Sequence, residues 1–270
     1  MKGDGLLSIS ELARCARISR TALIHYDHMG LVTPIERGEN NYRYYSHSQI
    51  TSTNLINTLQ SLGMSLKEIM ELIRRRTPGG VSALFARQGD IIKGEIERLE
   101  RSRKLLSTLR EMVDIGLAAD EDVIEARVED EESVYMGPQM DYSGGKTIEE
   151  ATLDFYEYCM ERDPDMDMNY PVWGFFSEER VKNRDWYGPD KFYFWMPDAP
   201  DRKPQGLYAV GYTRGYYGHC DDLYRRMIKF IADNGFEVCG PAWEMYPLNE
   251  ISIVNKDNYL IKVSISIKRA

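Results

Sequence analysis

The sequence predicts an α+β protein in three parts: an all-α winged helix-turn-helix head over residues 1–79, a long helix over 80–115 and an α+β domain over 120–270. Three observations support this division. The chain opens with two short helical patterns followed by a basic, aromatic hairpin. A long stretch of helical periodicity comes next, and the remaining residues then repeat one order of strands and helices twice.

The first helix of the head is marked by a capping box. Ser8 is followed by Glu11, a spacing at which the two side chains satisfy each other's free backbone N–H groups at a helix start. A polar break at residues 17–20 precedes a second helix, which ends at Gly30. In a helix-turn-helix this second helix enters the major groove of DNA. The pattern therefore predicts a DNA-binding head.

A second pair of helices is expected after the hairpin, over residues 47–60 and 65–76. Ser65 with Glu68 forms another capping box at the start of the second one. The Thr-Pro-Gly-Gly segment at 77–80 is expected to interrupt the helical structure, because proline lacks an N–H donor and clashes with the preceding turn.

From residue 81 to about 113, apolar residues return mostly every three or four positions. A helix of roughly 33 residues would be about 50 Å long, too long for a small head to cover. One interpretation is an amphipathic helix packed on its own tail domain. The interpretation that we favour is a two-stranded coiled coil between two subunits, which predicts a homodimer.

Charge is distributed unevenly along the chain. The formal net charge is -9, but residues 1–79 carry 10 Lys and Arg against 7 Asp and Glu, whereas residues 120–270 carry 17 against 30. A basic head can meet phosphates, while an acidic tail is suited to attracting a cation.

Composition excludes several other classes. No apolar run approaches the length of a membrane span, and no signal peptide opens the chain, so we expect a cytoplasmic protein without a membrane partner. The four cysteines, at 15, 159, 220 and 239, form no CxxC pair. We therefore expect reduced thiols, no metal site and no cofactor.

The tail repeats itself. Each half contains a strand, a helix, a segment with a Pro-x-Trp signature and a final strand. In the first half these follow an opening strand near 123–127 and lie near 133–140, 147–160, 170–176 and 191–197; in the second half they lie near 207–215, 220–234, 239–247 and 259–267. The repeat predicts a pseudo-two-fold domain of antiparallel strands flanked by helices.

The order of helix-turn-helix, wing with NYRYYS at 41–46, helical pair with LGMSLKEI at 62–69 and long helix resembles the MerR family of transcription regulators, over residues 6 to about 113. The resemblance implies a dimer held by an antiparallel coiled coil on an inverted repeat in promoter DNA. Such activators bend and untwist an overlong spacer between the −35 and −10 elements, so that RNA polymerase can align both.

The resemblance places DNA contacts on the second helix and the wing. The candidate DNA-binding residues are Arg17, Arg20, Thr21, His25, Tyr26, Tyr42, Arg43 and Tyr44. Two positions depart from the family pattern: Ile24 stands where an arginine is usual, and Asn41 where the wing usually has glycine, although asparagine tolerates a positive φ. Of the wing tyrosines we expect at least one in the core. Arg43 is the firmest candidate, because a basic residue between tyrosines on a hairpin has little use in a core.

The tail resembles the GyrI-like effector-binding domain, and its combination with this head resembles multidrug-sensing regulators of the BmrR type. The resemblance implies that Glu244 lies in an aromatic pocket and pairs with lipophilic cations. A carboxylate among aromatic rings suits a bulky organic cation, and burial would raise the pKa of the empty site. The alternative is an exposed strand glutamate, since Trp243 and Met245 alternate with it.

The other candidate ligand-binding residues are aromatic, and about half are expected to be ordinary core residues: Tyr135, Tyr142, Tyr170, Trp173, Tyr187, Trp195, Tyr208, Trp243 and Tyr246. Tyr170 and Trp173 rank first, because their segment is the repeat partner of the one that carries Glu244.

Three functions compete. A ligand-responsive activator is favoured. A metal or redox sensor would need cysteines near the end of the long helix, and residues 100–125 contain none. The remaining alternative is a tail that hydrolyses small electrophiles, with Glu244 and Tyr246 as base and donor. Since no Ser-His or Cys-His arrangement is present to activate a nucleophile, we expect no enzyme and assign no catalytic residue.

Overall fold

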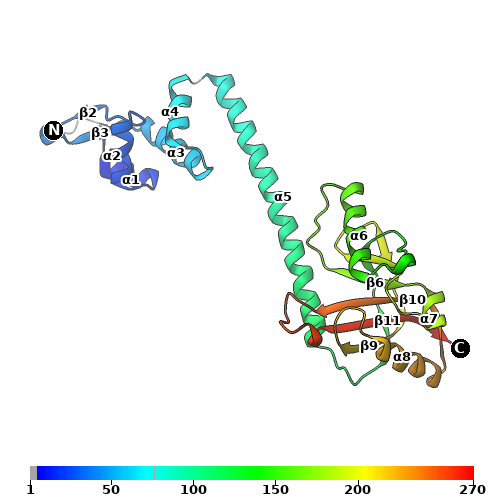
Figure 1. Ribbon diagram of the computed structural model, residues 1–270. Helices are drawn as coiled ribbons and strands as arrows, with labels where there is room; N and C mark the ends of the chain where they lie inside the picture. Colours follow the sequence, from blue (N-terminus) through cyan, green and yellow to red (C-terminus); the bar gives the residue numbers. More distant parts are fainter. Residues whose placement is uncertain (1–4, 76) are drawn as a thin grey trace. The chain divides into compact units, whose positions relative to one another are not determined.

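The computed structural model describes residues 5–75 and 77–270. Their contacts group the chain into two compact units, Met1–Glu97 and Arg98–Ala270. The mixture of helices and antiparallel strands confirms the predicted α+β class (Figure 1). The domain limits of the sequence analysis stay a prediction.

The first unit contains the expected helices and wing. Helices α1 (Ile9–Ala16) and α2 (Arg20–Met29) are followed by α3 (Ser48–Ser61) and α4 (Leu66–Arg75). Strands β1 (Leu7–Ser8), β2 (Glu36–Arg37) and β3 (Arg43–Tyr45) form a small sheet in the order β1-β3-β2, with a 3-10 turn at Glu39–Asn41. These elements form the predicted winged helix-turn-helix.

Local signals in the sequence explain the ends of these helices. Both capping boxes are present, Ser8 with Glu11 and Ser65 with Glu68. Gly30 ends α2 with a φ of 73°, and Asn41 adopts a φ of 61° in the wing. The core of this unit is built from Leu12, Leu23, Tyr26, Tyr45, Ile56, Leu59 and Ile69.

Helix α5 spans Pro78–Leu117, 40 residues. The predicted interruption is confirmed at Thr77, between α4 and α5, but it does not extend to residue 80, because Pro78 opens α5. The first N–H groups of a helix have no partner within it, so a proline there costs no hydrogen bond. Thr77 Oγ1 accepts a hydrogen bond from the Gly80 N–H at 3.1 Å and caps the start. Residue 76, the predicted end of the preceding helix, lies outside the described residues.

The second unit is an eight-stranded antiparallel sheet in the order β4-β9-β11-β10-β6-β7-β5-β8. Its strands are β4 (Glu125–Glu129), β5 (Glu132–Met136), β6 (Val172–Phe176), β7 (Lys191–Trp195), β8 (Asp201–Lys203), β9 (Gly206–Arg214), β10 (Phe236–Leu248) and β11 (Leu260–Arg269). Its helices are α6 (Ile148–Arg162), α7 (Glu178–Asn183) and α8 (Asp221–Asp233). Among the α-helices and strands of this unit, the sequence analysis missed α7 and β8, which are its shortest α-helix and its shortest strand.

The sheet order bears out the predicted repeat. Strands β9, β11 and β10 of one half mirror β5, β7 and β6 of the other, and β10 pairs with β6 at the centre. Glu244 stands directly opposite Gly174 in this central pair. The two positions also match by repeat, since each follows the tryptophan of its Pro-x-Trp signature. The pseudo-two-fold axis therefore passes beside Glu244.

Candidate functional site

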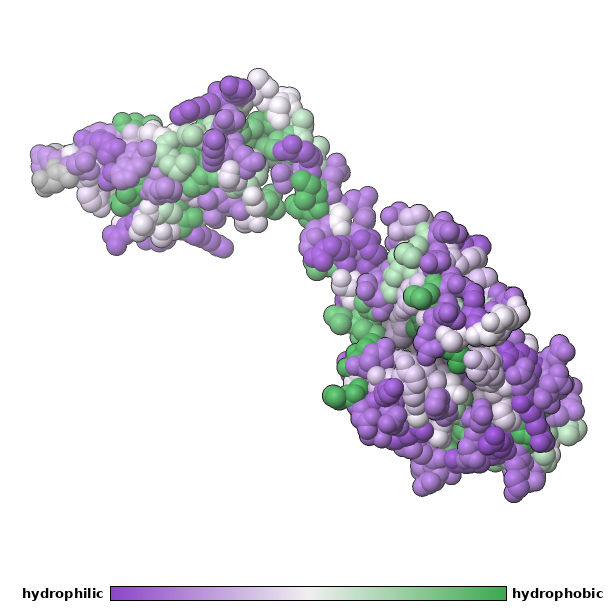
Figure 2. Space-filling view, viewed as in Figure 1, coloured by the Kyte–Doolittle hydropathy of each residue, from purple (hydrophilic) through white to green (hydrophobic). Residues whose placement is uncertain are grey.

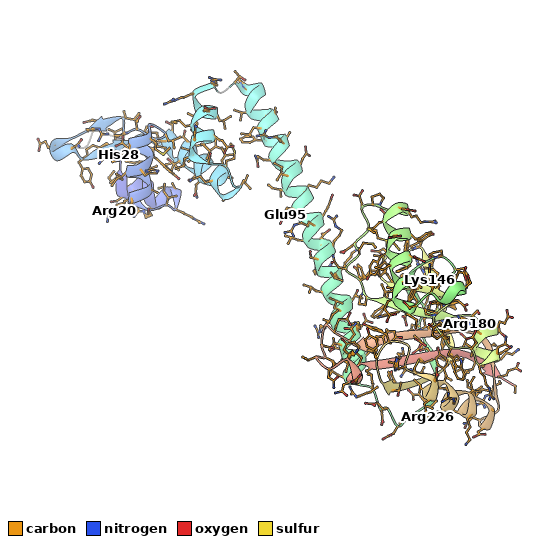
Figure 3. All side chains as sticks on the ribbon, in the orientation of Figure 1. Arg20, His28, Glu95, Lys146, Arg180 and Arg226 are labelled. Carbon is orange, nitrogen blue, oxygen red and sulfur yellow. The ribbon has the colours of Figure 1, made fainter. Side chains whose placement is uncertain are left out.

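The head presents a polar surface on α2 and on the turn that precedes it. Arg17, Arg20, Thr21 and His25 are all exposed, and Figure 3 shows Arg20 at the start of α2. Tyr26 is different: it is 4% exposed, it packs in the head core, and its hydroxyl donates to Gln60. These positions place four of the five candidates from the helix-turn-helix on the surface.

The wing is held to α2 by a carboxylate that the sequence analysis missed. Asp27 accepts hydrogen bonds from Arg37 Nη2 at 2.8 and 2.9 Å and from Arg43 Nε at 2.6 Å. Burial favours a higher pKa for Asp27, but the two arginines hold it below its ordinary value. The argument that Arg43 has little use in a core is therefore wrong, because Arg43 ties β3 to α2.

The wing tyrosines divide as expected. Tyr45 is fully buried, Tyr44 is half-buried and Tyr42 is 46% exposed. The rings of Tyr42 and Tyr44 are in contact, with centroids 5.4 Å apart. Tyr42 therefore offers the most accessible aromatic face of the wing.

In the second unit, Glu244 lies in a row of directly paired residues that share one face of the sheet. The row runs Phe192, Gly174, Glu244, Val263, Gly211. At one end Phe192 packs against Phe155 of α6, and at the other a side chain at Gly211 would meet Leu223 of α8. Helices α6 and α8 therefore cover the same face, with Glu244 between them.

A cavity of about 500 Å³ opens on this face. It is lined by residues of α6, β6, β10 and the loops around 216–218 and 249–251, including Tyr156, Tyr170, Phe176, Phe192, Tyr217, Glu244 and Tyr246. A Cβ at Gly174 would lie 3.6 Å from Glu244 Oε2, an ordinary contact distance, and 3.2 Å from Pro189 Cβ, so the glycine adjoins the carboxylate directly. Glu244 is 2% exposed. The alternative of an exposed strand glutamate therefore does not hold.

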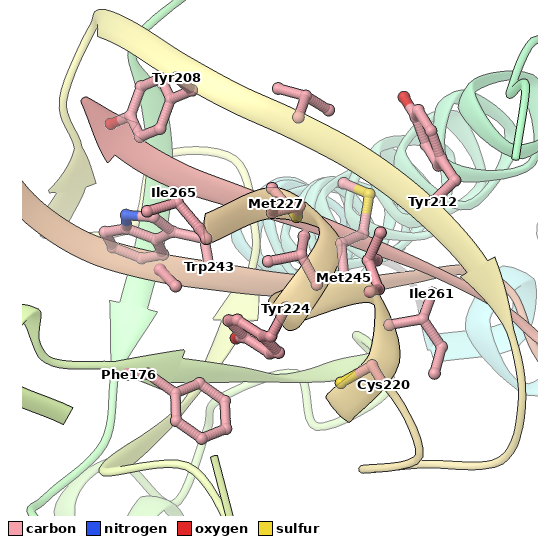
Figure 4. Close-up of a cluster of buried hydrophobic side chains, with 14 of the residues drawn as sticks. Phe176, Tyr208, Tyr212, Cys220, Tyr224, Met227, Trp243, Met245, Ile261 and Ile265 are labelled. Carbon is pink, nitrogen blue, oxygen red and sulfur yellow. The ribbon is translucent and has the colours of Figure 1, made fainter. Parts of the chain in front are cut away.

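Three neutral groups donate to the Glu244 carboxylate. Tyr246 Oη donates to Oε2 at 2.8 Å, while Tyr224 Oη and Cys220 Sγ donate to Oε1 at 3.0 and 3.2 Å. Figure 4 shows Tyr224 and Cys220 at the start of α8. Burial raises the pKa of Glu244, and the three hydrogen bonds offset this only in part. Among the residues that the structure describes, no cationic side chain pairs with this carboxylate.

Four of the candidate ligand-binding residues line this cavity: Glu244, Tyr170, Trp173 and Tyr246. Trp173 precedes Gly174 in β6, so its ring points to the opposite face of the sheet, where it stacks on Trp195 with centroids 5.3 Å apart. The cavity is thus bordered by both halves of the repeat.

The other candidates lie elsewhere in the second unit. Tyr142 donates to the Pro189 carbonyl at 3.1 Å, and Tyr208 donates to the Pro204 carbonyl at 2.7 Å. Tyr135 lies in β5 and pairs with β7, while Tyr187 is 62% exposed in a neighbouring groove. Trp243 packs against Phe175 and Tyr193. Trp243 is adjacent to Glu244 in β10 and so points to the opposite face.

Sequence reasoning missed the donors Cys220 and Tyr224. A signal for Tyr224 exists, since it shares the apolar face of α8 with Met227 and Ile231 and so brings a hydroxyl into the core. Cys220 carries no such signal, because it precedes the helix.

Groups of three or more side chains suited to metal binding are absent from the described residues. No helix in the described part of the chain is both long and apolar enough to span a bilayer.

Comparisons with known proteins give two family models that match the N-terminal part of the chain and one relative that matches nearly all of it. The model described as MerR HTH family regulatory protein matches residues 7–76, and that described as MerR, DNA binding matches 54–109. The chain is 30% identical to the multidrug-efflux transporter 2 regulator of Bacillus subtilis (strain 168), over 96% of this chain and 95% of that protein. It is also 30% identical to the HTH-type transcriptional regulator CueR of Salmonella typhi, over 43% of this chain and 80% of that one. Among solved structures, the EcmrR–DNA complex in EcmrR-RPo aligns with 98% of this chain and 100% of that one, at 15% identity and a TM-score of 0.42.

Proposed function

The chain belongs to the MerR family of transcriptional regulators, and we propose that it is an activator that responds to a lipophilic cation bound in its C-terminal unit. It is a DNA-binding regulator, and regulators of this family are not enzymes. The proposal has three further parts. The protein binds its ligand and acts as a homodimer in the cytoplasm. The dimer remodels an inverted-repeat promoter so that RNA polymerase can use it. The proposal also adopts the division into a head at 1–79, a dimer helix at 80–115 and an effector domain at 120–270.

The observation that carries the ligand proposal is Glu244. A carboxylate that is 2% exposed and has only neutral donors is costly to ionise without a cationic partner. An organic cation supplies the missing charge, and its apolar groups fit among the tyrosine and phenylalanine rings. The related Bacillus subtilis protein is named as a regulator of a multidrug-efflux transporter, which supports such a ligand.

The exposed face of α5 supports the dimer. Six of its large apolar side chains are 39–66% exposed: Phe85, Ile91, Ile92, Ile96, Leu99 and Leu106. Figure 2 shows apolar surface along this helix. A second α5 would bury this stripe, as in a coiled coil. A monomeric mass in solution at micromolar concentration would contradict the dimer.

The exposed residues of the head support the DNA contacts. Arg17, Arg20, Thr21 and His25 would face the groove, while Tyr42 would reach the DNA backbone from the wing. Tyr44 and Arg43 are half-buried; we propose that Arg43 acts mainly by holding the wing to α2 through Asp27. Tyr26 would then act from the core, by fixing the position of α2.

The ligand proposal is tested by titrating the full chain with tetraphenylphosphonium and following tryptophan fluorescence. We expect saturable quenching in the native protein. Glu244→Gln should bind roughly 10- to 100-fold more weakly, since a charge-assisted contact contributes about 1.5–3 kcal/mol. The matched control is Glu179→Gln, because Glu179 is exposed on α7 and does not line the cavity. Equal affinities in the native protein and Glu244→Gln would rule the proposal out.

A further inference from the structure

A second carboxylate, Glu250, lines the same cavity as Glu244. It is exposed, in the loop that follows β10, and it accepts a hydrogen bond from the Tyr217 hydroxyl. The ring of Tyr217 lies edge-on to that of Tyr246, with centroids 4.5 Å apart. Tyr246 in turn donates to Glu244 at 2.8 Å. One carboxylate therefore lies at each end of a contacting pair of tyrosines.

Aromatic rings surround Glu250 at the mouth of the cavity. Tyr217 packs against Tyr259 with centroids 5.6 Å apart, and Tyr156 lines the cavity from α6. The pKa values of Tyr156 and Tyr259 are raised, first by burial and then by the charge of Glu250, as expected for rings close to that carboxylate. A carboxylate among tyrosine faces is the chemistry that binds quaternary ammonium groups.

One cationic side chain already lies against a tyrosine ring of this cluster. Lys256 Nζ lies 4.8 Å from the ring centroid of Tyr216, whose ring contacts Tyr217. Glu250 itself has no ion pair among residues 5–75 and 77–270. Its charge is thus available to a cation that enters from outside.

Apolar side chains lie at the same opening. Leu153 of α6 and Ile251, next to Glu250, line the cavity and are 63% and 56% exposed. Exposed apolar residues beside a charged group suit a ligand with an aliphatic segment next to its cationic end.

We propose that Glu250 and Tyr217 form a second cation subsite at the mouth, so that the cavity takes an elongated dication with one charge at Glu244 and the other at Glu250. The chain between the two charges would pass along Tyr246 and Tyr217. This inference rests on the proposed function, since it assigns a ligand class to the same cavity.

The test uses two matched ligands on the full-length protein. Decamethonium carries a trimethylammonium group at each end of a ten-carbon chain, and decyltrimethylammonium carries only one. We expect native protein to bind decamethonium more tightly. Glu250→Gln should weaken decamethonium binding roughly five-fold and leave the affinity for decyltrimethylammonium within about two-fold, since an exposed charge contact is modest. Titration calorimetry gives all of these affinities.

Two further variants make the result specific. Tyr217→Phe keeps the ring but removes the hydroxyl that holds Glu250, so it should lower the affinity for decamethonium alone, by roughly two-fold. Glu179→Gln, an exposed carboxylate outside the cavity, should change neither affinity. A circular dichroism melt of each variant confirms that it folds.

The outcomes separate the two proposals. Equal affinity of native protein for both ligands, or a loss in Glu250→Gln that is the same for both, overturns the second subsite and leaves Glu244 as the cation site. Unchanged affinity of both ligands in Glu244→Gln overturns the proposed function itself.

Discussion

Two buried carboxylates, one in each unit, have opposite surroundings. Asp27 in the head is 7% exposed and bonds two arginines, whereas Glu244 in the tail is 2% exposed and bonds two tyrosines and a cysteine. Burial alone raises the pKa of both. The arginines nevertheless hold the pKa of Asp27 below its ordinary value, while that of Glu244 remains above it. A buried acid with its cation in the same chain serves the fold, and one without it favours a cation from outside.

Glu129 shows that the raised pKa of Glu244 is not a general property of buried carboxylates in the tail. It lies in the same unit as Glu244 and is 7% exposed, yet Lys203 Nζ and Lys262 Nζ each approach it to 2.7 Å. Burial favours a raised pKa, but the two lysines hold the pKa of Glu129 well below its ordinary value. The charge of the partner, and not the depth of burial, therefore sets the direction of the pKa shift in these two carboxylates.

The largest expected effect follows from removing the charge of Glu129. Glu129→Gln leaves Lys203 and Lys262, whose side chains are 4% and 6% exposed, without this partner. Breaking a buried ion pair in this way costs about 3–5 kcal/mol. Chemical denaturation of the full chain, with hydrogen exchange of β9 and β11, measures the loss. Glu125→Gln is the control on the same strand, because Glu125 is 51% exposed and should cost under about 1 kcal/mol. A similar cost for both variants would refute the comparison.

Removing the charge of Asp27 in the head should lower the free energy of unfolding by less. Asp27→Asn weakens the link between α2 and the wing, and we expect a loss of about 2 kcal/mol, below the buried-pair range because the Arg37 side chain is 42% exposed. Since the pKa of Asp27 is lowered on folding, its contribution is present above the ordinary pKa and is lost as the pH falls through the folded-state value.

Hydrogen exchange of α2 and β3 checks this, in native protein and variant from neutral pH down into the acid range. The native head should lose protection below about pH 4, where the variant should show no such step. Glu36→Gln, an exposed carboxylate on β2, is the control. Protection of β3 that is unaltered in Asp27→Asn would show that the arginines do not hold the wing.

The features that the sequence predicts well depend on neighbours along the chain. Ser8 with Glu11 and Ser65 with Glu68 are three residues apart, so their capping boxes follow from spacing alone. The repeat of the tail is equally visible, because its Pro-x-Trp signatures recur in matching positions. The pocket position of Glu244 was implied by the resemblance to the GyrI-like domain, and the pairing of β6 with β10 was not predicted.

The partners of buried charges could not be predicted, because they come from distant elements. Tyr224 and Cys220 lie 20 and 24 residues from Glu244, on and before a helix that crosses another part of the sheet. Arg43 lies 16 residues from Asp27, and nothing in a hairpin pattern says that its guanidinium turns toward α2. Spacing along the chain carries no information on such contacts, which depend on how the elements pack.

The smallest expected effect has the opposite sign and is the sharpest test of the comparison. Because the pKa of Glu244 is raised on folding, its contribution to stability is lost as the pH rises through the folded-state value. At neutral pH, Glu244→Gln should therefore stabilise the empty protein, by about 1 kcal/mol, since it removes a buried charge without a cation. Thermal unfolding from acid to neutral pH should show native stability falling relative to the variant. Saturating tetraphenylphosphonium should reverse the order, because only the native carboxylate pairs with it. A variant that is less stable than native protein at neutral pH, without ligand, would mean that the tyrosines and Cys220 already satisfy the charge and that Glu244, like Asp27, serves the fold.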